Sequence, residues 1–543
     1  MALQRRTVRP TQPKPATATS IAAPSLGMDG RVILAEGNPE IATYTYNLVS
    51  DETGMKVRSG YGEYCVDLVS AVSEGVRTIV PYEPPTVVSG DKRLFAMTNE
   101  GIWDVTTFNT PILKLSFSST AGNAGVGVFQ HYVTDAGDSL LFYADSENGL
   151  FTYDKTLDTW AQTTGITGVT ITDIVFVTVH KQRIWLTIKD SADAYYLGVG
   201  AIAGAATKFQ FGNKFKRGGI LVGIYSWTID GGAGIDDYLV GISSAGDVLP
   251  YQGADPESVS SDLWQLKGVY YVGEITGGVK CASEFGGDLH ILSAQGVTPL
   301  SQLLQGVDVS IAKDGIGVKT AFYLRPEIRQ YRNDLGWGID YFPSISYVVI
   351  STPKRLDSTY IQYAYDVQKN TFGWWRDVPM LCATEWNGVI YVGTEDSRVL
   401  VMDKDLDDVK ITPVAGQTNG VPISFSCLFA FGTYDSGGLF KRGVSVRPDF
   451  ISRNKINYQM RFLYDYEIKN FATSVTIDER LAGRWDSAVW DADIWGTSLL
   501  ENKSKVIGGA GMGRRMAIAV QGAASSSTFL MSYDVMWNTG GML

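Results

Sequence analysis

The chain has 543 residues, too many for one ordinary hydrophobic core, which predicts a large domain together with a smaller one. Only 19% of the residues are charged, and Gly, Tyr and Trp are frequent, so strands and turns are favoured over surface helices. The net charge of −11 argues against a protein that wraps nucleic acid tightly, because such binding needs Lys and Arg to displace counterions from phosphate.

Residues 1–28 differ in composition from the rest of the chain. They contain prolines, small polar residues and no acidic residue, and their four basic residues are Arg5, Arg6, Arg9 and Lys14. Such a segment cannot bury enough apolar surface to fold alone, so we expect an extended basic arm held by a neighbouring subunit or partner. A disordered leader is the alternative. Residues 29–84 are expected to supply strands that pack with the C-terminal domain or close a propeller.

Between residues 85 and 410 one pattern recurs: a short apolar strand, a polar turn and a second apolar strand. The copies follow at intervals of roughly 40–60 residues, the spacing of radially repeated β-sheets. They are KRLFAMTNEGIWDV (92–105), DSLLFYADSENGLFTYD (138–154), QRIWLTIKDSADAYYLGV (182–199), DYLVGISSAGDVLPYQG (237–253), GGDLHILSAQGVTPL (286–300), SYVVISTPKRLDSTYIQYAYD (346–366) and NGVIYVGTEDSRVLVMD (387–403). The pattern predicts a β-propeller of six to seven blades, whose closure leaves only short protected sheet edges.

Two segments indicate the kind of blade. In TYDKTLDTW (152–160) and AYDVQKNTFGWW (364–375), a Tyr-Asp pair closes one strand, a polar turn follows and a Trp opens the next strand. This arrangement is similar to that of kelch blades. We therefore expect kelch-like hairpins at both places.

After residue 411 the expected strands become longer. In KINYQMRFLYDY (455–466) the alternation places Ile456, Tyr458, Met460 and Phe462 on one face, which is typical of an antiparallel sheet or sandwich with one buried face. We expect a C-terminal β platform domain over residues 411–543. No helix longer than a few turns is expected anywhere in the chain.

The residues that could carry chemistry form no catalytic pattern. The histidines, His131, His180 and His290, are isolated in apolar stretches without metal-ligand spacing, and there is no GxSxG elbow. GGAGMGRR (508–515) lacks the Lys-Ser/Thr of a phosphate loop and is expected to be a tight β-turn. DKDLDD (403–408) lacks the glycine of a calcium loop. We therefore expect a protein that is not an enzyme and has no cofactor or metal.

The cysteines and the apolar runs bear on the compartment. Four cysteines lie far apart without a CxxC pair, which favours folding in a reducing cytoplasm: Cys65, Cys281, Cys382 and Cys427. No apolar run approaches the ~18 residues that span a bilayer, and the N-terminus lacks the hydrophobic core of a signal peptide. We expect a soluble protein.

The stretch RWDSAVWDADIWG (484–496) spaces three tryptophans five residues apart: Trp485, Trp490 and Trp495. This period fits neither a helix nor a strand, so the indoles cannot form one continuous face of either. Asp486 and Asp491 can accept backbone N–H groups two residues onward. The stretch therefore predicts two successive turns anchored by tryptophans, with a carbohydrate-binding platform as the alternative.

Several dispersed features resemble one family when taken in order. YNLVSDETGMKVRSGYGEY (46–64) contains a G-x-x-x-R-x-G-Y pattern, formed by Gly54, Arg58, Gly60 and Tyr61. VPYE (80–83) precedes the first repeat, and the tryptophan stretch, GGAGMGRRMAIAV (508–520) and MSYDVMWNTGGML (531–543) follow near the end. This order resembles the tail nozzle protein of short-tailed bacteriophages (podoviruses), also called tail tubular protein B.

The resemblance implies a structural virion protein. It implies a hexameric tail nozzle below the adaptor (tail tubular A-like) ring, with contacts to tail fibre or spike proteins and a channel for phage genomic DNA, assembled in the host cytoplasm. An acidic wall would repel phosphate and let DNA slide. Two alternatives stay open. One is a propeller glycosidase acting on host surface polysaccharide, with two carboxylates among acids such as Asp173, Glu284 and Asp366. The other is a kelch-type protein-binding module.

Overall fold

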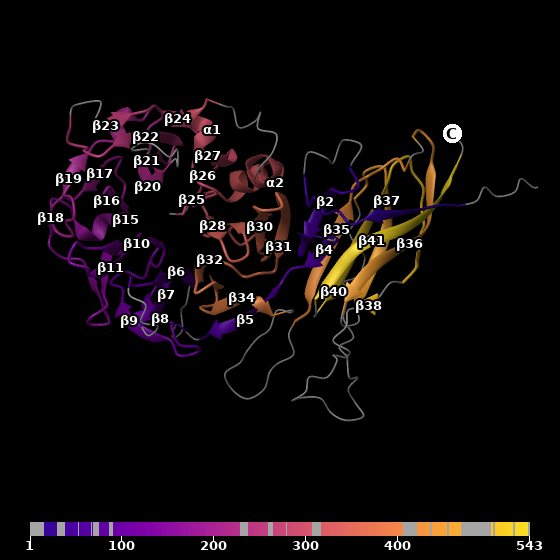
Figure 1. Cartoon of the computed structure of the whole chain (residues 1–543), viewed down its shortest axis with the longest axis horizontal. Coiled ribbons are helices and arrows are strands. Elements are labelled where there is room, and N and C mark those ends of the chain that lie inside the picture. The colour runs from indigo at the N-terminus through magenta and orange to yellow at the C-terminus, as the bar shows by residue number, and fades with distance from the viewer. Residues whose placement is uncertain are drawn as a thin grey trace, which may run out of the picture. The chain divides into compact units, whose positions relative to one another are not determined.

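The chain forms two compact units in the computed structural model (Figure 1). Unit 1 combines both ends of the chain, Met1–Arg58 and Pro422–Leu543, and unit 2 is the intervening Ser59–Val421. The structure describes residues 16–29, 38–52, 54–66, 68, 75–85, 91–228, 237–258, 264–277, 280–306, 316–405, 421–434, 437–452, 456–468, 501–502, 505–524 and 527–540. In sequence, unit 2 is thus an insertion into unit 1.

Unit 2 is a β-propeller with seven antiparallel sheets among its described residues (Figure 1). Blade 1 consists of β6 (Val76–Tyr82), β7 (Arg93–Thr98), β8 (Gly101–Asp104) and β9 (Ile112–Ser116). Blade 2 consists of β10 (Gly127–Val133), β11 (Ser139–Asp145), β12 (Gly149–Asp154) and β13 (Thr159–Gln162). Blade 3 consists of β15 (Ile174–His180), β16 (Arg183–Ile188), β17 (Ala194–Tyr196) and β19 (Thr207–Phe209). Blade 4 consists of β20 (Leu221–Thr228), β21 (Asp237–Ser243), β22 (Asp247–Gly253), β23 (Trp264–Leu266) and β24 (Tyr270–Tyr271).

The last three blades include the helices and the closing strand. Blade 5 consists of β25 (Ala282–Phe285), β26 (Asp288–Ser293) and β27 (Gly296–Pro299), followed by α1 (Leu300–Leu304) and α2 (Ile316–Tyr331), which pack against β27. Blade 6 consists of β28 (Gly338–Phe342), β29 (Tyr347–Ser351), β30 (Ile361–Asp366) and β31 (Thr371–Arg376). Blade 7 consists of β32 (Cys382–Trp386), β33 (Val389–Gly393), β34 (Val399–Asp405) and β5 (Gly60–Cys65). Smaller elements are β14 (Ile166–Thr167), β18 (Gly204–Ala205), η3 (Ile171–Asp173) and η4 (Gly212–Lys214).

The ring closes through a strand from the other end of unit 2. The first strand of each blade lies nearest the axis, neighbouring blades touch in turn, and β32 of blade 7 contacts β6 of blade 1 (Figure 1). The outer strand of blade 7 is β5, which pairs antiparallel with β34 although their residues are more than 300 positions apart. The prediction of an all-β propeller is confirmed, and its seven repeats are the second and third strands of the seven blades.

In five of the blades, a buried polar side chain that bonds to the following turn stands at the end of the second strand or directly after it. These fully buried residues are Thr98, Asp145, Ser243, Ser293 and Thr394. Each bonds to the backbone of the turn that follows; for example, the Asp145 carboxylate accepts the N–H groups of the next turn at 2.9–3.1 Å. Local hydrogen bonds of this kind fix a hairpin from its own sequence. This explains why the repeats are visible in the chain.

The kelch-like hairpins lie where they were expected. The Asp154 carboxylate accepts the N–H of Thr156 at 2.7 Å after β12, and Asp366 accepts two N–H groups at 3.0 Å after β30. In each hairpin a tyrosine hydroxyl from the first strand donates to a turn residue with positive φ, Asp158 or Asn370. Asp366 is therefore the cap of a turn. The sequence had placed Asp366 among the acids of a propeller glycosidase, whereas its carboxylate here accepts the N–H groups of its own turn.

Unit 1 is a β-sandwich built from both ends of the chain. In one layer β3 (Leu48–Asp51), β4 (Gly54–Val57), β41 (Thr528–Thr539), β36 (Lys441–Ser452) and β38 (Glu501–Asn502) pair in that order, with β1 (Thr17–Ala22) on β41 and β39 (Ile507–Gly508) on β36. In the other, β2 (Ala42–Tyr46), β35 (Ile423–Phe429), β40 (Met516–Ala524) and β37 (Asn457–Tyr464) pair in that order. One apolar core joins the layers, and it contains Ile456, Met460 and Phe462 with Tyr458 against it, as the alternation predicts.

Three expectations about the ends and the helices need revision. The segment 29–84 is not one structural element, because β2 to β4 belong to unit 1 whereas β5 and β6 belong to unit 2. The arm expected over residues 1–28 is shorter, since β1 pairs with the chain's own β41. Helix α2 has 16 residues, longer than expected, and it buries one face against β27.

Candidate functional site

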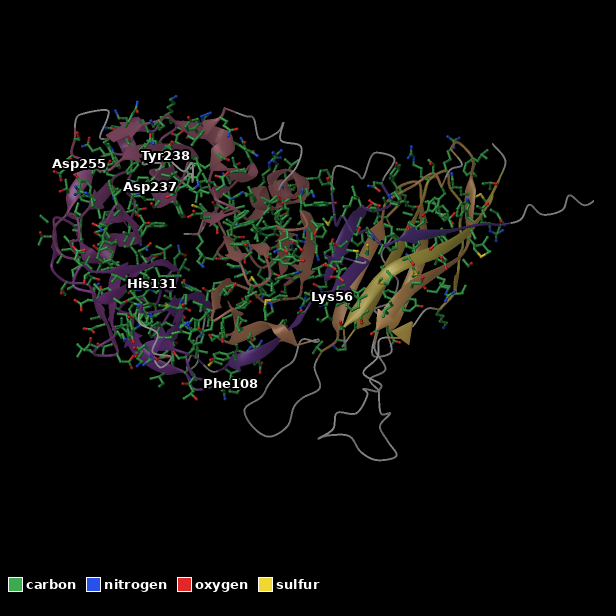
Figure 2. The ribbon with its side chains drawn as sticks, viewed as in Figure 1. Lys56, Phe108, His131, Asp237, Tyr238 and Asp255 are labelled. Carbon is green, nitrogen blue, oxygen red and sulfur yellow. The ribbon has the colours of Figure 1, made fainter. Side chains whose placement is uncertain are left out.

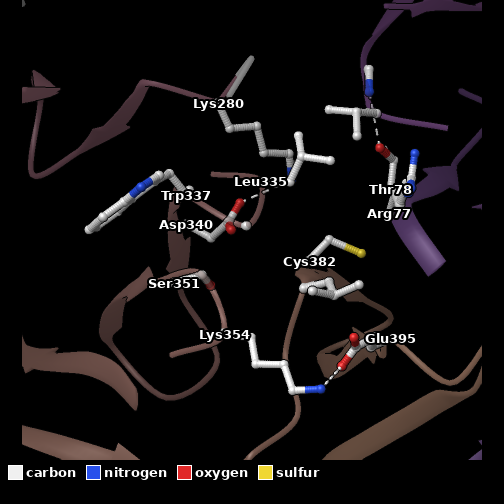
Figure 3. Close-up of a pocket in the computed structure, with 15 residues that line it drawn as sticks. Arg77, Thr78, Lys280, Leu335, Trp337, Asp340, Ser351, Lys354, Cys382 and Glu395 are labelled. Carbon is white, nitrogen blue, oxygen red and sulfur yellow. Dashed lines mark hydrogen bonds and ion pairs between the residues drawn. The ribbon is translucent and has the colours of Figure 1, made fainter. Parts of the chain in front are cut away.

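One candidate site in the described part of unit 2 is a cavity of about 400 Å³ at the propeller axis (Figure 3). First strands of four blades contribute to its wall: β6, β10, β28 and β32. Five ionisable side chains point into or line it, and we call this cavity the axial pocket: Arg77, Lys280, Asp340, Lys354 and Glu395. Three cations and two carboxylates thus come together from blades 1, 5, 6 and 7.

One side of the axial pocket is an ion pair between blades 5 and 6. Lys280, just before β25, donates to Asp340 Oδ1 at 3.1 Å and to the carbonyl of Ala383 at 3.5 Å. Burial is the largest single influence and lowers the pKa of Lys280, but the charge of Asp340, the charge of Cys382 and the hydrogen bond to Asp340 together raise the pKa above its usual value. Lys280 is therefore a stable cation and not a neutral base.

The opposite side holds Lys354 and Glu395, whose Nζ and Oε2 lie 2.6 Å apart. The Tyr360 hydroxyl donates to the same carboxylate. Hydrogen bonds from Lys354 and Tyr360 lower the pKa of Glu395 below its usual value. A glycosidase needs one carboxyl with a raised pKa to protonate the leaving oxygen. The shift at Glu395 has the opposite direction, so Glu395 does not have the electrostatics of that acid.

The pocket also contains a cysteine and two hydroxyls that are engaged in structural bonds. Cys382 Sγ donates to the carbonyl of Val76 at 3.4 Å, and burial raises its pKa to about 12, so the reactive thiolate is scarce at neutral pH. Thr78 Oγ1 donates to Gly125 O at 2.8 Å, and Ser351 Oγ contacts Met380 Sδ at 3.1 Å. No base adjoins Cys382 among the described contacts, so this set does not resemble an activated nucleophile.

The three histidines lie apart and have structural surroundings. His131 donates from Nε2 to the Pro81 carbonyl at 3.0 Å (Figure 2), and burial lowers its pKa. His180 Nδ1 lies 2.8 Å from Ser226 Oγ, and burial followed by the Lys181 charge lowers its pKa to about 4. His290 stacks on Phe285 with ring centroids 3.6 Å apart. Neutral, buried imidazoles of this kind are packing residues.

The G-x-x-x-R-x-G-Y residues lie where the chain continues from unit 1, which ends at Arg58, into unit 2, which begins at Ser59. A Cβ on Gly54 would lie 2.4 Å from the Leu530 carbonyl oxygen, so only glycine fits beside β41. Arg58 is buried, and its Nε donates to Asn47 Oδ1 at 2.9 Å. Gly60 and Tyr61 begin the closing strand β5. All four residues have packing or pairing roles.

The remaining predicted residues lie partly inside and partly outside the described ranges. Arg5, Arg6, Arg9 and Lys14, and the turn residues Trp485, Asp486, Trp490, Asp491 and Trp495, lie outside the described residues. The glycine-rich segment 508–515 is extended along β36 instead of forming a tight turn, and its glycines pack on aromatic rings: a Cβ on Gly509 would lie 2.4 Å from Phe462. Asp173 and Glu284 are exposed, on η3 and β25.

The described residues contain no group of three His, Cys, Asp or Glu side chains close enough to hold a metal ion. No helix in them is long and apolar enough to cross a bilayer. The four cysteines are buried and free.

Comparisons with known proteins concern the fold alone. No protein-family model and no curated protein matches the chain. Among solved structures, the extracellular domain of a putative hybrid two-component system from B. thetaiotaomicron matches 60% of this chain at 12% identity and a TM-score of 0.37, over 40% of its own length. BBS1N in complex with ARL6DN matches 67% at 10% identity and 0.36, over 100% of its length. YCF48 from Cyanidioschyzon merolae matches 62% at 12% identity and 0.35, over 97% of its length. Similarities this distant carry no functional argument.

Proposed function

We propose that this chain is a structural virion protein, the tail nozzle of a short-tailed bacteriophage. Six copies would form a ring below the adaptor ring, with the propellers in its wall and the genome passing through the middle. The observation that carries the proposal is the placement of the G-x-x-x-R-x-G-Y residues. They fix the passage from the sandwich into the ring-closing strand, so the motif behind the resemblance serves architecture and not chemistry.

The N-terminal segment supports a role in assembly, now limited to the residues before β1. Strand β1 lies on the edge of β41, and five of its six side chains are exposed. The basic residues Arg5, Arg6, Arg9 and Lys14 precede this surface strand in sequence, and we assign them the contact with another subunit or the adaptor. An acidic neighbour would attract them, because the acidic residues of the chain all lie after residue 28.

The charge of the chain supports passage of DNA instead of binding. With a net charge of −11, a ring of copies repels phosphate on average, and a polyanion can slide through it. The axial pocket inside each propeller is a small cavity with paired charges, so the proposed conduit lies between copies and not along a propeller axis.

A deletion of residues 1–15 tests the proposal without removing β1. The full chain, alone or with its adaptor ring, should give hollow sixfold rings in negative-stain images, and the deletion variant should keep its circular dichroism spectrum and melting temperature but not assemble. A full chain that stays monomeric beside the adaptor ring would contradict the nozzle. Rings that form equally well after the deletion would contradict the role of the arm.

A further inference from the structure

The axial pocket presents two ion pairs on opposite sides of one cavity (Figure 3). Lys280 and Asp340 form one, and Lys354 and Glu395 form the other. Arg77 lies on a third side, where its Nη1 donates to the carbonyls of Gly122 and Ala124 at 2.8 Å. The tail assignment gives this arrangement no role.

Lys354 and Glu395 both have further capacity for hydrogen bonds. An ammonium group has three donors, and a carboxylate has about four acceptor positions. The described hydrogen bond of Lys354 uses one donor, on Glu395, and its side chain is 39% exposed. Glu395 accepts the lysine and Tyr360 on the same oxygen, Oε2. The pocket therefore offers cationic donors and anionic acceptors side by side.

Part of the neutral wall is apolar. Leu335, Trp337 and Val126 line the cavity between the charged groups. A cavity of about 400 Å³ lies in the lower part of the range of roughly 300–1,000 Å³ that holds small molecules, and a few placed polar groups in an apolar wall are usual for such sites. Ring carbons fit against such a wall.

We propose that the axial pocket binds a small polyhydroxylated carboxylate, a sugar acid with one negative charge. The carboxylate would take the donors of Lys354 and its cationic neighbours, while hydroxyl groups would donate to Glu395 and Asp340. The three cations and two carboxylates of the lining leave one positive charge, which one carboxylate balances. A neutral sugar lacks the anion, and phosphate is repelled by the two acids and has too few donors for them.

In the direct test, the full chain is titrated with sodium glucuronate, glucose or inorganic phosphate, and binding is measured by saturation-transfer NMR and calorimetry. Glucuronate should bind in the millimolar range, and glucose and phosphate about tenfold more weakly, the contribution of one charge-assisted hydrogen bond. A uronate trisaccharide separates the two sources of this chemistry. Equal or tighter trimer binding indicates a polysaccharide, and exclusion of the trimer indicates a free sugar acid.

Substitutions of Lys354 test whether glucuronate binds in the axial pocket. Lys354→Met should weaken glucuronate binding about tenfold and leave glucose unchanged, and Lys354→Arg should restore most of it. Lys189→Met is the matched control, because Lys189 pairs with Glu147 at the same 2.6 Å outside the pocket. Absence of saturable glucuronate binding, equal binding of phosphate, or unchanged binding in Lys354→Met would overturn the proposal. None of these outcomes depends on ring assembly, so the tail assignment can fail separately.

Discussion

Replacing Arg398 with methionine is expected to loosen the strand pair that closes the propeller. Arg398, just before β34, forms ion pairs with Glu63 of β5 and, at 2.5 Å, with Asp396. The Glu63 side chain is only 7% exposed, and that of Arg398 is 19% exposed. Methionine keeps much of the volume but leaves a buried carboxylate without its cation. Breaking a buried pair costs about 3–5 kcal/mol, and partial exposure of Arg398 places this case near about 3 kcal/mol.

Hydrogen exchange followed by mass spectrometry, together with denaturant unfolding, measures this effect. Exchange should quicken in β5 and β34 before it does in other blades, because β5 closes the ring. Adding Glu63→Gln removes the stranded charge and should recover most of the loss. Lys189→Met, which breaks an exposed pair, should cost less than about 1 kcal/mol. A loss below about 0.5 kcal/mol for Arg398→Met, or equal acceleration in all blades, would refute the reasoning.

Three further substitutions test local packing and burial. Gly149 has φ +85°, and a Cβ there would lie 2.2 Å from the Ile171 carbonyl oxygen, so Gly149→Ala should reduce the free energy of unfolding by more than about 3 kcal/mol. Gly137 has φ +89° but lies in open space, so Gly137→Ala should reduce it by only about 1 kcal/mol. Similar melting temperatures for the two variants would be evidence against this reasoning. Burial lowers the pKa of His180 to about 4 in the folded chain, so between about pH 6.5 and 4 the unfolded chain binds a proton at this residue and the folded chain does not. Stability should decrease as the pH falls from about 6.5 toward 4, by up to about 1.4 kcal/mol per pH unit, and His180→Gln should flatten this slope in denaturant titrations.

The blades could be predicted from sequence because each repeat carries its own turn. Residues such as Asp145 and Thr394 bond to the backbone within a few positions, so the signal is local. The closing strand β5 has no comparable signal, since its pairing with β34 depends on residues far away in the chain. For the same reason the segment 29–84 could not be divided between the units.

Helix α2 was missed because its sequence hides the period. Its buried positions include Ile316, Thr320, Leu324 and Ile328, spaced four apart, but Pro326 stands inside the helix. Glu327 is also buried, where it accepts a hydrogen bond from Tyr363 and pairs with Arg355. A buried acid breaks the apolar pattern unless its partners are known.

The axial pocket could not be assembled from sequence either. Lys280, Asp340, Lys354 and Glu395 come from three blades, and their spacing matches no ligand motif. Glu395 alone has a local hint, because it directly follows the buried turn residue Thr394. Charged side chains beside a turn are ordinary surface residues until closure of the ring brings them together.

The insertion of the propeller into the sandwich has a consequence for synthesis on the ribosome. Strand β5 emerges early but must wait for β34, β2 must wait for β35, and β1 and β4 must wait for β41. Neither unit can complete its hydrogen bonding until most of the chain has been translated, so nascent chains expose unpaired strand edges for a long time. Interrupted translation products would therefore lack a finished version of either unit.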